Sequence, residues 1–148
     1  MNRLEAVTLA NQLLCDFDLE NWTFKINTRA KTRLGCCKYY PKVIELSAWC
    51  LDGGVVPGKA EDTIRHEIAH AIAGMDAGHG PVWRKACMVT GANPNRCASQ
   101  QVINEMPAAK FKLVCDKCHK KLGERHRRSD MNNRFHRNCG GDISFKLN

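Results

Sequence analysis

The alternation of apolar and polar residues along the first third of the chain predicts one helix followed by three short strands. Apolar residues recur at close to helical spacing over residues 4–17, which predicts an amphipathic helix. WTFKIN, residues 22–27, alternates apolar and polar side chains as a half-buried strand does. LGCCKYYP and KVIELS, residues 34–47, predict two further strands, bounded by Gly35 and Pro41. We therefore expect a small antiparallel sheet.

Two further helices are predicted after the turn-rich segment LDGGVVPGKAED, residues 51–62. Its acids precede the apolar run TIRHEIAHAIA at residues 63–73, and negative charge favours the start of a helix. Gly74 fits the end of this helix. After the loop MDAGHGP, the segment VWRKACMVTG predicts another helix, which ends at Gly91. Helices packed on one small sheet place the chain in the α+β class.

Length and composition limit what such a fold can be. A chain of 148 residues with 43% hydrophobic content can bury one core and a small additional module. It has no apolar run of 18 residues and no apolar leader, so we expect neither a membrane span nor a secretory signal. Nine cysteines, an odd number, disfavour a closed disulfide framework. We therefore expect a reducing, intracellular compartment. If the source is prokaryotic or a virus of bacteria, the protein would be cytoplasmic and associated with the nucleoid. We expect it to be a monomer.

Positive charge is concentrated at the C-terminal end. Residues 110–148 contain eleven Lys and Arg against four Asp and Glu, a net +7, whereas residues 1–109 have twelve against eleven, a net +1. We assign residues 1–108 and 109–148 to two domains on this basis. The basic segment predicts a polyanionic partner, and the alternative is a solvated face that only keeps the protein soluble.

The segment HEIAH, residues 66–70, has the H-E-x-x-H pattern of zinc peptidases. On a helix, His66 and His70 lie on one face, close enough to bind one metal ion, and Glu67 projects beside them. Zinc with three protein ligands keeps a fourth position for water and lowers the pKa of that water. Glu67 would accept the water's proton as a general base. The alternative is a helix with two partly exposed histidines and no metal.

The third ligand of this site must come from outside the helix. Asp76 stands where a metzincin has its third histidine, and Glu105 is the only acid in residues 77–115. His79 lies nine residues after His70 on a glycine-flanked loop, and glycine permits the unusual backbone angles of a return to the metal. We favour His79 over Glu105.

A second set of metal-ligand spacings lies in the basic domain. Cys115 and Cys118 form a C-x2-C pair, and after seventeen intervening residues His136 and Cys139 form an H-x2-C pair, close to the spacing of a zinc ribbon. So short a segment builds little core, so metal would supply its folding energy. The alternative is a set of unligated thiols in a disordered tail. The histidines that could replace His136 as the third ligand are His119 and His126.

The order of these features resembles the SprT-like family of zinc metalloproteases. A tryptophan-bearing strand precedes a Leu-Gly turn, an Ile-x-Leu-Ser strand, the H-E-x-x-H helix and the sequence GHGPVW. The resemblance covers residues 22–83 and continues into the ribbon, where the family usually has four cysteines. It implies that His66, His70 and His79 bind zinc and that Glu67 is the catalytic base.

Together these observations predict an α+β protein in which a small antiparallel sheet packs against helices, one of them a zincin-like H-E-x-x-H helix, followed by a zinc ribbon. We expect two zinc ions, one catalytic and one structural. The resemblance implies a metalloendopeptidase of DNA repair that cleaves DNA-bound or DNA-crosslinked proteins. The cations around the ribbon predict DNA binding without sequence preference. The alternative is a non-proteolytic nucleic-acid-binding module with structural zinc, but the intact Glu67 favours the enzyme.

Overall fold

The computed structural model describes residues 1–95 and 107–148. Within these residues the protein is α+β, with three α-helices and two small sheets, which confirms the predicted class. The chain divides into two compact units, Met1–Met106 and Pro107–Asn148, and each is described by itself. Among the helices described, none is both long and apolar enough to span a membrane.

The sheet of the first unit has the strand order β1-β3-β2. The central strand β3 pairs parallel with β1 and antiparallel with β2, so the prediction of a purely antiparallel sheet is wrong. The connections give the reason: a short hairpin turns β2 back along β3, whereas residues 28–34 carry the chain from β1 across the end of β3. The strands are β1 (Thr23–Asn27), β2 (Gly35–Lys38) and β3 (Val43–Ser47).

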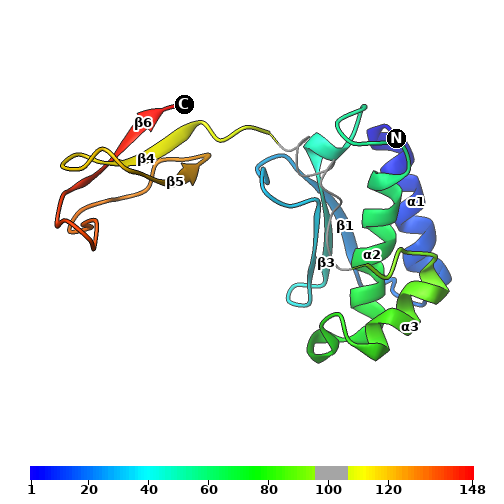
Figure 1. Ribbon diagram of the computed structural model, residues 1–148. Helices are drawn as coiled ribbons and strands as arrows, with labels where there is room; N and C mark the ends of the chain where they lie inside the picture. Colours follow the sequence, from blue (N-terminus) through cyan, green and yellow to red (C-terminus); the bar gives the residue numbers. More distant parts are fainter. Residues whose placement is uncertain (96–106) are drawn as a thin grey trace. The chain divides into compact units, whose positions relative to one another are not determined.

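The two faces of this sheet differ in chemistry, because successive strand residues point to opposite sides. One face is apolar, and helices α1 and α2 cover it (Figure 1). The opposite face carries polar and charged residues, with Lys25 and Glu45 directly opposite each other in the β1–β3 register. The apolar face is formed by Phe24, Ile26, Ile44 and Leu46.

Helix α1, Arg3–Asp16, begins at a capping box in which Asn2 and Glu5 exchange side-chain-to-backbone hydrogen bonds. Leu4 and Val7, which the apolar pattern marks as core positions, are exposed because they lie on the outer side of the helix. Two alanines occupy the middle of the buried side, and small side chains there allow α1 to pack closely on its neighbours. The buried residues are Ala6, Ala10, Leu13 and Leu14.

Helices α2, Lys59–Ala73, and α3, Pro81–Thr90, pack against each other. Glu61 and Asp62 lie in the first turn of α2, where negative charge stabilises the helix dipole. Both predicted helices are therefore present, and α2 begins four residues before its apolar run. A second small core between them contains Ala69, Trp83, Ala86, Cys87 and Ala92.

The second unit is a small sheet with the strand order β5-β4-β6, in which both neighbours pair antiparallel with β4. Its buried apolar residues lie together on the central strand, and an edge-to-face contact of Phe111 with Phe145 adds to them. This core is too small to stabilise the unit by itself. The strands are β4 (Phe111–Cys115), β5 (Lys121–Arg125) and β6 (Ile143–Leu147).

Candidate metal centres

Helix α2 positions the first candidate centre. Its buried residues Ile64 and Ile68 anchor one side of the helix in the main core. The half-buried His66, Glu67 and His70 lie on the side that faces an open cleft. The helix therefore holds all three side chains on a rigid backbone, which positions them more precisely than a loop would.

The loop after α2 brings a third histidine to the same place. Gly74 ends the helix with a φ of 87°, and Gly78 has a φ of 50°, both of which disfavour residues that have a side chain. Pro81 then begins α3 at a position that proline suits. The chain thereby reverses, and His79 returns to the exposed side of α2.

The three histidines converge on one point. The Nε2 atom of His79 lies 3.1 Å from Nε2 of His70 and 3.3 Å from Nε2 of His66. All three ligand atoms lie within 4.8 Å of one another. A tetrahedral zinc ion with Zn–N bonds of about 2.0–2.1 Å requires nitrogens about 3.3–3.4 Å apart. The separations in the structure therefore fit a single zinc ion.

Trp83 of α3 supports this cluster from below. It is fully buried, and its ring centroid lies 4.8 Å from that of His66, 5.3 Å from that of His70 and 4.5 Å from that of His79. The ring of His70 stacks on the indole with an interplanar angle of 26°. One side chain thus restricts the orientation of all three imidazoles. The sequence signal for this role was only the nearness of Trp83 to His79.

The electrostatics of the cluster favour neutral imidazoles. Burial, together with the neighbouring His79, lowers the pKa of His66 to about 4. Burial and the two adjacent histidines lower the pKa of His70 to about 4 as well. Metal ions bind the neutral form of histidine, so both side chains are ready to bind at neutral pH.

Glu67 lies at the cleft next to strand β2. Burial raises the pKa of its carboxyl to about 7, while a hydrogen bond from the backbone N–H of Cys37 and the charge of Arg33 oppose that rise. A Cβ atom on Gly35 would lie 2.8 Å from Cγ of Glu67. Gly35 therefore leaves the space that Glu67 occupies, and an isolated glycine in a strand was the sequence signal for such a close approach.

Tyr39, just after β2, holds the C-terminal end of α2. Its hydroxyl lies 3.0 Å from the carbonyl oxygen of His70 and 3.1 Å from that of Gly74, and it donates to these acceptors. The ring packs edge-to-face on Trp22. Sequence reasoning missed Tyr39, because nothing local connects it to carbonyls more than thirty residues away.

The second candidate centre lies in the ribbon unit. Sγ of Cys115 is 3.4 Å from Sγ of Cys139, and Nδ1 of His136 is 3.3 Å from Sγ of Cys118 and 3.2 Å from Sγ of Cys139. The four ligand atoms all lie within 4.8 Å of one another, and none of the cysteines is in a disulfide. Four nitrogen and sulfur donors so placed suit one tetrahedral ion.

The local backbone prepares this second centre for metal. A hydrogen bond from the backbone N–H of Cys118, together with weaker contributions from the neighbouring Lys117 and Cys139, lowers the pKa of Cys115 to about 6. Thiolate is the form that binds metal. A Cβ atom on Gly141 would lie 2.7 Å from Sγ of Cys115, so a glycine is needed beside the cluster.

The two histidines that were alternatives to His136 do not join the ribbon cluster. His119 and His126 are not among the four residues of the ribbon cluster, which contains His136. Glu105, the alternative third ligand of the first centre, lies outside the described residues.

A model of the SprT-like family matches residues 4–122. The match spans α2, the His79 loop and the first cysteine pair of the ribbon, and it covers well over half of the chain. Comparisons with curated proteins and with solved structures give no match. The chain belongs to the SprT-like family.

Proposed function

We propose that this protein is a zinc metalloendopeptidase that cleaves proteins bound or crosslinked to DNA. The observation that carries the hydrolytic part is the convergence of three histidine nitrogens beside the carboxylate of Glu67 at one open cleft. A purely structural zinc site closes its coordination with a fourth protein ligand, whereas a catalytic site keeps an open position. Within the described residues, the cluster of His66, His70 and His79 has three ligands.

The chain's own residues would divide the work of hydrolysis. A zinc ion bound by the three histidines supplies Lewis acidity to water and to the scissile carbonyl. The Glu67 carboxylate accepts the proton that the attacking water loses and passes it to the nitrogen of the leaving peptide. In the metal-free protein burial raises the pKa of Glu67 to about 7, so the carboxylate is basic enough to accept a proton near neutral pH.

The second zinc ion is proposed to be structural. Three cysteines and a histidine complete a tetrahedral shell, so no position is left for water. Because the ribbon unit buries so little apolar surface, metal binding would supply much of its folding free energy.

The DNA-binding part of the proposal rests on the ribbon's exposed cations. They lie in the turns and edge strand around the second centre, where they can reach phosphates. Phosphate contacts give salt-dependent affinity without sequence preference. DNA would then act by bringing peptidase and substrate together, which raises their effective concentration. The exposed cations include Lys117, Lys120, Lys121, Arg127, Arg128, Arg134 and Arg137.

The testing experiment compares wild type with Glu67→Gln on a protein substrate crosslinked to DNA. We expect cleavage by the wild type and a loss of about a hundredfold to ten-thousandfold in rate for the variant, which is typical of a missing general base. Zinc content and DNA affinity should not change, because Glu67 binds neither. A zinc-loaded wild type that binds DNA but cuts no protein would instead support a non-proteolytic binding module.

A further inference from the structure

A segment of the first unit has an unusual charge distribution. Residues 21–44 contain six Lys and Arg and no Asp or Glu. Residues 1–109 hold twelve cations in all, so half of them lie in a segment that has no carboxylate of its own. The six are Lys25, Arg29, Lys31, Arg33, Lys38 and Lys42, and together with Tyr40 we call them the basic sheet surface.

The sheet register places part of this surface on the face away from the helices. Lys25 on β1 is opposite Glu45 on β3, while the rows on either side of this pair point into the main core. The carboxylate of Glu45 accepts hydrogen bonds from Asn27 at 2.8 Å, Arg33 at 3.1 Å and Lys38 at 2.5 Å. A carboxylate with two cations leaves this polar face with positive charge even before Lys25 is counted.

The other cations of the surface are available to a ligand. Lys25, Arg29, Lys31 and Lys42 are exposed, and none of them forms an ion pair with a carboxylate of the described residues. Phosphates could therefore approach them without breaking an existing ion pair. Arg29 and Lys31 lie in the β1–β2 connection and Lys42 in the β2–β3 hairpin, so the charges extend past both ends of the sheet.

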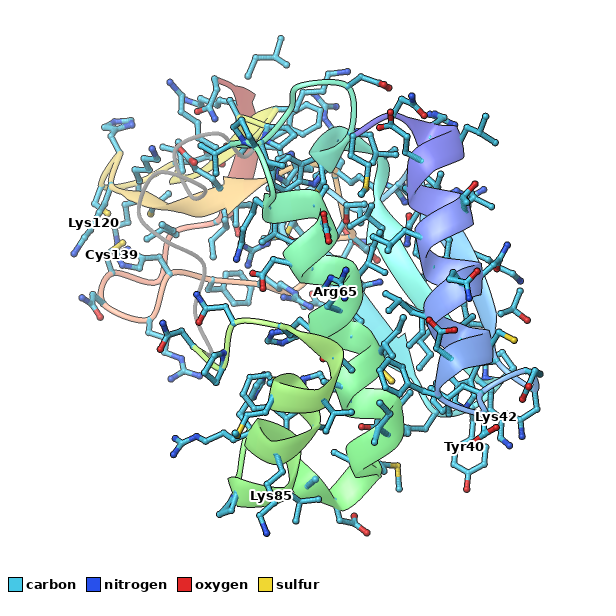
Figure 2. The ribbon with its side chains drawn as sticks, turned by 90° about the vertical axis from the view of Figure 1, so that its right-hand side faces the viewer. Tyr40, Lys42, Arg65, Lys85, Lys120 and Cys139 are labelled. Carbon is cyan, nitrogen blue, oxygen red and sulfur yellow. The ribbon has the colours of Figure 1, made fainter. Side chains whose placement is uncertain are left out.

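An exposed aromatic side chain lies at one end of the surface. Tyr40, in the hairpin between β2 and β3, is 86% exposed. Figure 2 shows Tyr40 and Lys42 at the same end of the fold, both projecting away from it. The side chain of the preceding residue, Tyr39, is by contrast fixed by hydrogen bonds to carbonyls at the end of α2. An unburied aromatic ring between lysines is the arrangement on which proteins stack single-stranded bases.

We propose that the basic sheet surface binds single-stranded nucleic acid, with its cations on the phosphates and Tyr40 stacked on an unpaired base. This inference rests on the proposed function only in taking nucleic acid as the partner, and it adds a second contact site, on the peptidase unit itself. Strand β2 joins the two: it carries Lys38, and its residues Gly35, Cys36 and Cys37 line the cleft beside Glu67. A nucleic-acid strand bound to the basic sheet surface would therefore pass beside the candidate active site.

Other polyanionic partners fit these observations less well. An acidic protein segment would use the cations but would have no base to stack on Tyr40. A membrane surface calls for several exposed apolar side chains, and within residues 21–44 the exposed large hydrophobic side chain is that of Tyr40. A nucleic-acid strand uses both features, because it offers one phosphate and one base per nucleotide.

The test is a titration of full-length protein with a fluorescent oligothymidylate over a range of salt concentrations. The Glu67→Gln background prevents cleavage, and the double variant Lys25→Glu/Lys31→Glu is compared with Arg3→Glu/Lys85→Glu. The control pair lies on α1 and α3, is exposed and changes the net charge equally. We expect Lys25→Glu/Lys31→Glu, the sheet variant, to bind the oligonucleotide at least about tenfold more weakly. The slope of its log affinity against log salt concentration should fall in magnitude by about 1.4, whereas the affinity of the control variant should change less than about twofold.

A separate experiment tests the stacking of Tyr40 on a base. Tyr40→Ala should lower the affinity for the single-stranded oligonucleotide about fivefold or more, whereas Tyr40→Phe should leave it unchanged. The Tyr40→Ala and Tyr40→Phe variants should bind a duplex of the same length with equal affinity. Unchanged melting temperatures and zinc contents would show that the variants are folded.

The inference and the proposed function can fail separately. If the sheet variant binds like its control while Arg127→Glu/Arg128→Glu in the ribbon weakens binding, the basic sheet surface is overturned and DNA binding by the ribbon stands. If polyglutamate of equal charge competes as well as the oligonucleotide, the surface takes acidic protein and the inference is again overturned. Cleavage of a DNA-free protein substrate tests the peptidase independently of both.

Discussion

At the scale of single residues, burial is the feature of Glu67 that bears on its proposed role. It raises the pKa of the carboxyl to about 7, and the backbone of Cys37 and the charge of Arg33 oppose that rise. A carboxyl group with a pKa near neutral pH is suited to transfer protons. The adjacent His66 and His70 have pKa values lowered to about 4, so they remain neutral ligands while Glu67 titrates.

The raised pKa of Glu67 predicts how pH affects the stability of the metal-free protein. The protonated carboxyl is favoured by the fold, so its contribution to stability is full below about pH 4.5 and is lost as pH rises through about 7. Because glutamine cannot ionise, Glu67→Gln should be more stable than wild type by up to about 3 kcal/mol at pH 8 and by under about 1 kcal/mol at pH 5. Urea unfolding of chelator-treated protein at both pH values measures this. An equal difference at the two values would contradict the assigned pKa.

At the scale of elements, the approach of β2 to α2 shapes the cleft. The missing side chain of Gly35 makes that approach possible, since a Cβ atom there would lie 2.8 Å from both Glu67 Cγ and Thr63 Cγ2. Gly35→Ala should therefore push Glu67 or the strand aside and lower kcat by about tenfold or more, because misplaced catalytic groups lose rate steeply. Zinc content should be unchanged, because the ligand atoms of the first centre come from His66, His70 and His79 and none comes from Gly35.

The matched control for this change is Cys36→Ala, the next residue of the same strand. Cys36 also borders the cleft, but its side chain points to the opposite face of the sheet from α2, because successive strand residues alternate. Normal peptidase activity in Gly35→Ala, or an equal loss in Cys36→Ala, would show that the close approach does not position Glu67.

Tyr39 makes a second link between elements, from the β2–β3 hairpin to the end of α2. Tyr39→Phe removes the hydroxyl that hydrogen-bonds to two carbonyls at the end of α2. The loss should destabilise the folded end of this helix by about 1 kcal/mol. Because His70 lies in that last turn, we expect about fivefold weaker zinc binding at the first centre, measured by competition with a chromogenic chelator. Tyr40→Phe is the control, since the hydroxyl of Tyr40 lies on a largely exposed side chain. Equal zinc affinity in both variants would remove the positioning role of Tyr39.

The sequence predicted those elements whose signal is local. The strands and helices of the first unit lie close to their predicted positions, because apolar periodicity and bounding glycines act over a few residues. Strand order is non-local, and nothing in the pattern indicated that β1 would pair parallel with β3. The buried side of α1 was misjudged at Leu4 for a related reason: periodicity marks apolar residues, but only packing decides which of them face the core.

The candidate sites followed the same division. The sequence grouped His66, Glu67 and His70 through helical spacing, and the glycines around residue 79 indicated a returning loop. The contacts of Trp83 beneath the imidazoles and of Tyr39 at the helix end depend on tertiary structure, so the sequence could not show them. Burial of the cysteines outside the ribbon cluster also depends on packing: Cys50 and Cys87 are buried, whereas Cys15 is exposed on α1.

At the scale of the whole molecule, each compact unit contains one ligand set: three histidines in the first and three cysteines with a histidine in the second. Within residues 1–95 and 107–148, neither set takes a ligand from the other unit. We therefore expect two zinc ions per chain that bind independently. Elemental analysis should give a ratio near two for wild type and near one for both His79→Ala and Cys115→Ser.

The two losses should have different consequences, because the units depend on metal to different degrees. The first unit has a substantial apolar core, so His79→Ala should abolish proteolysis and leave the unit folded. The ribbon has almost no core, so Cys115→Ser should unfold it, remove most of its DNA affinity and spare the first centre. Amide hydrogen exchange of each variant, read unit by unit, distinguishes these outcomes. Loss of both ions in either variant would show that the centres are coupled and that the chain folds as one cooperative unit.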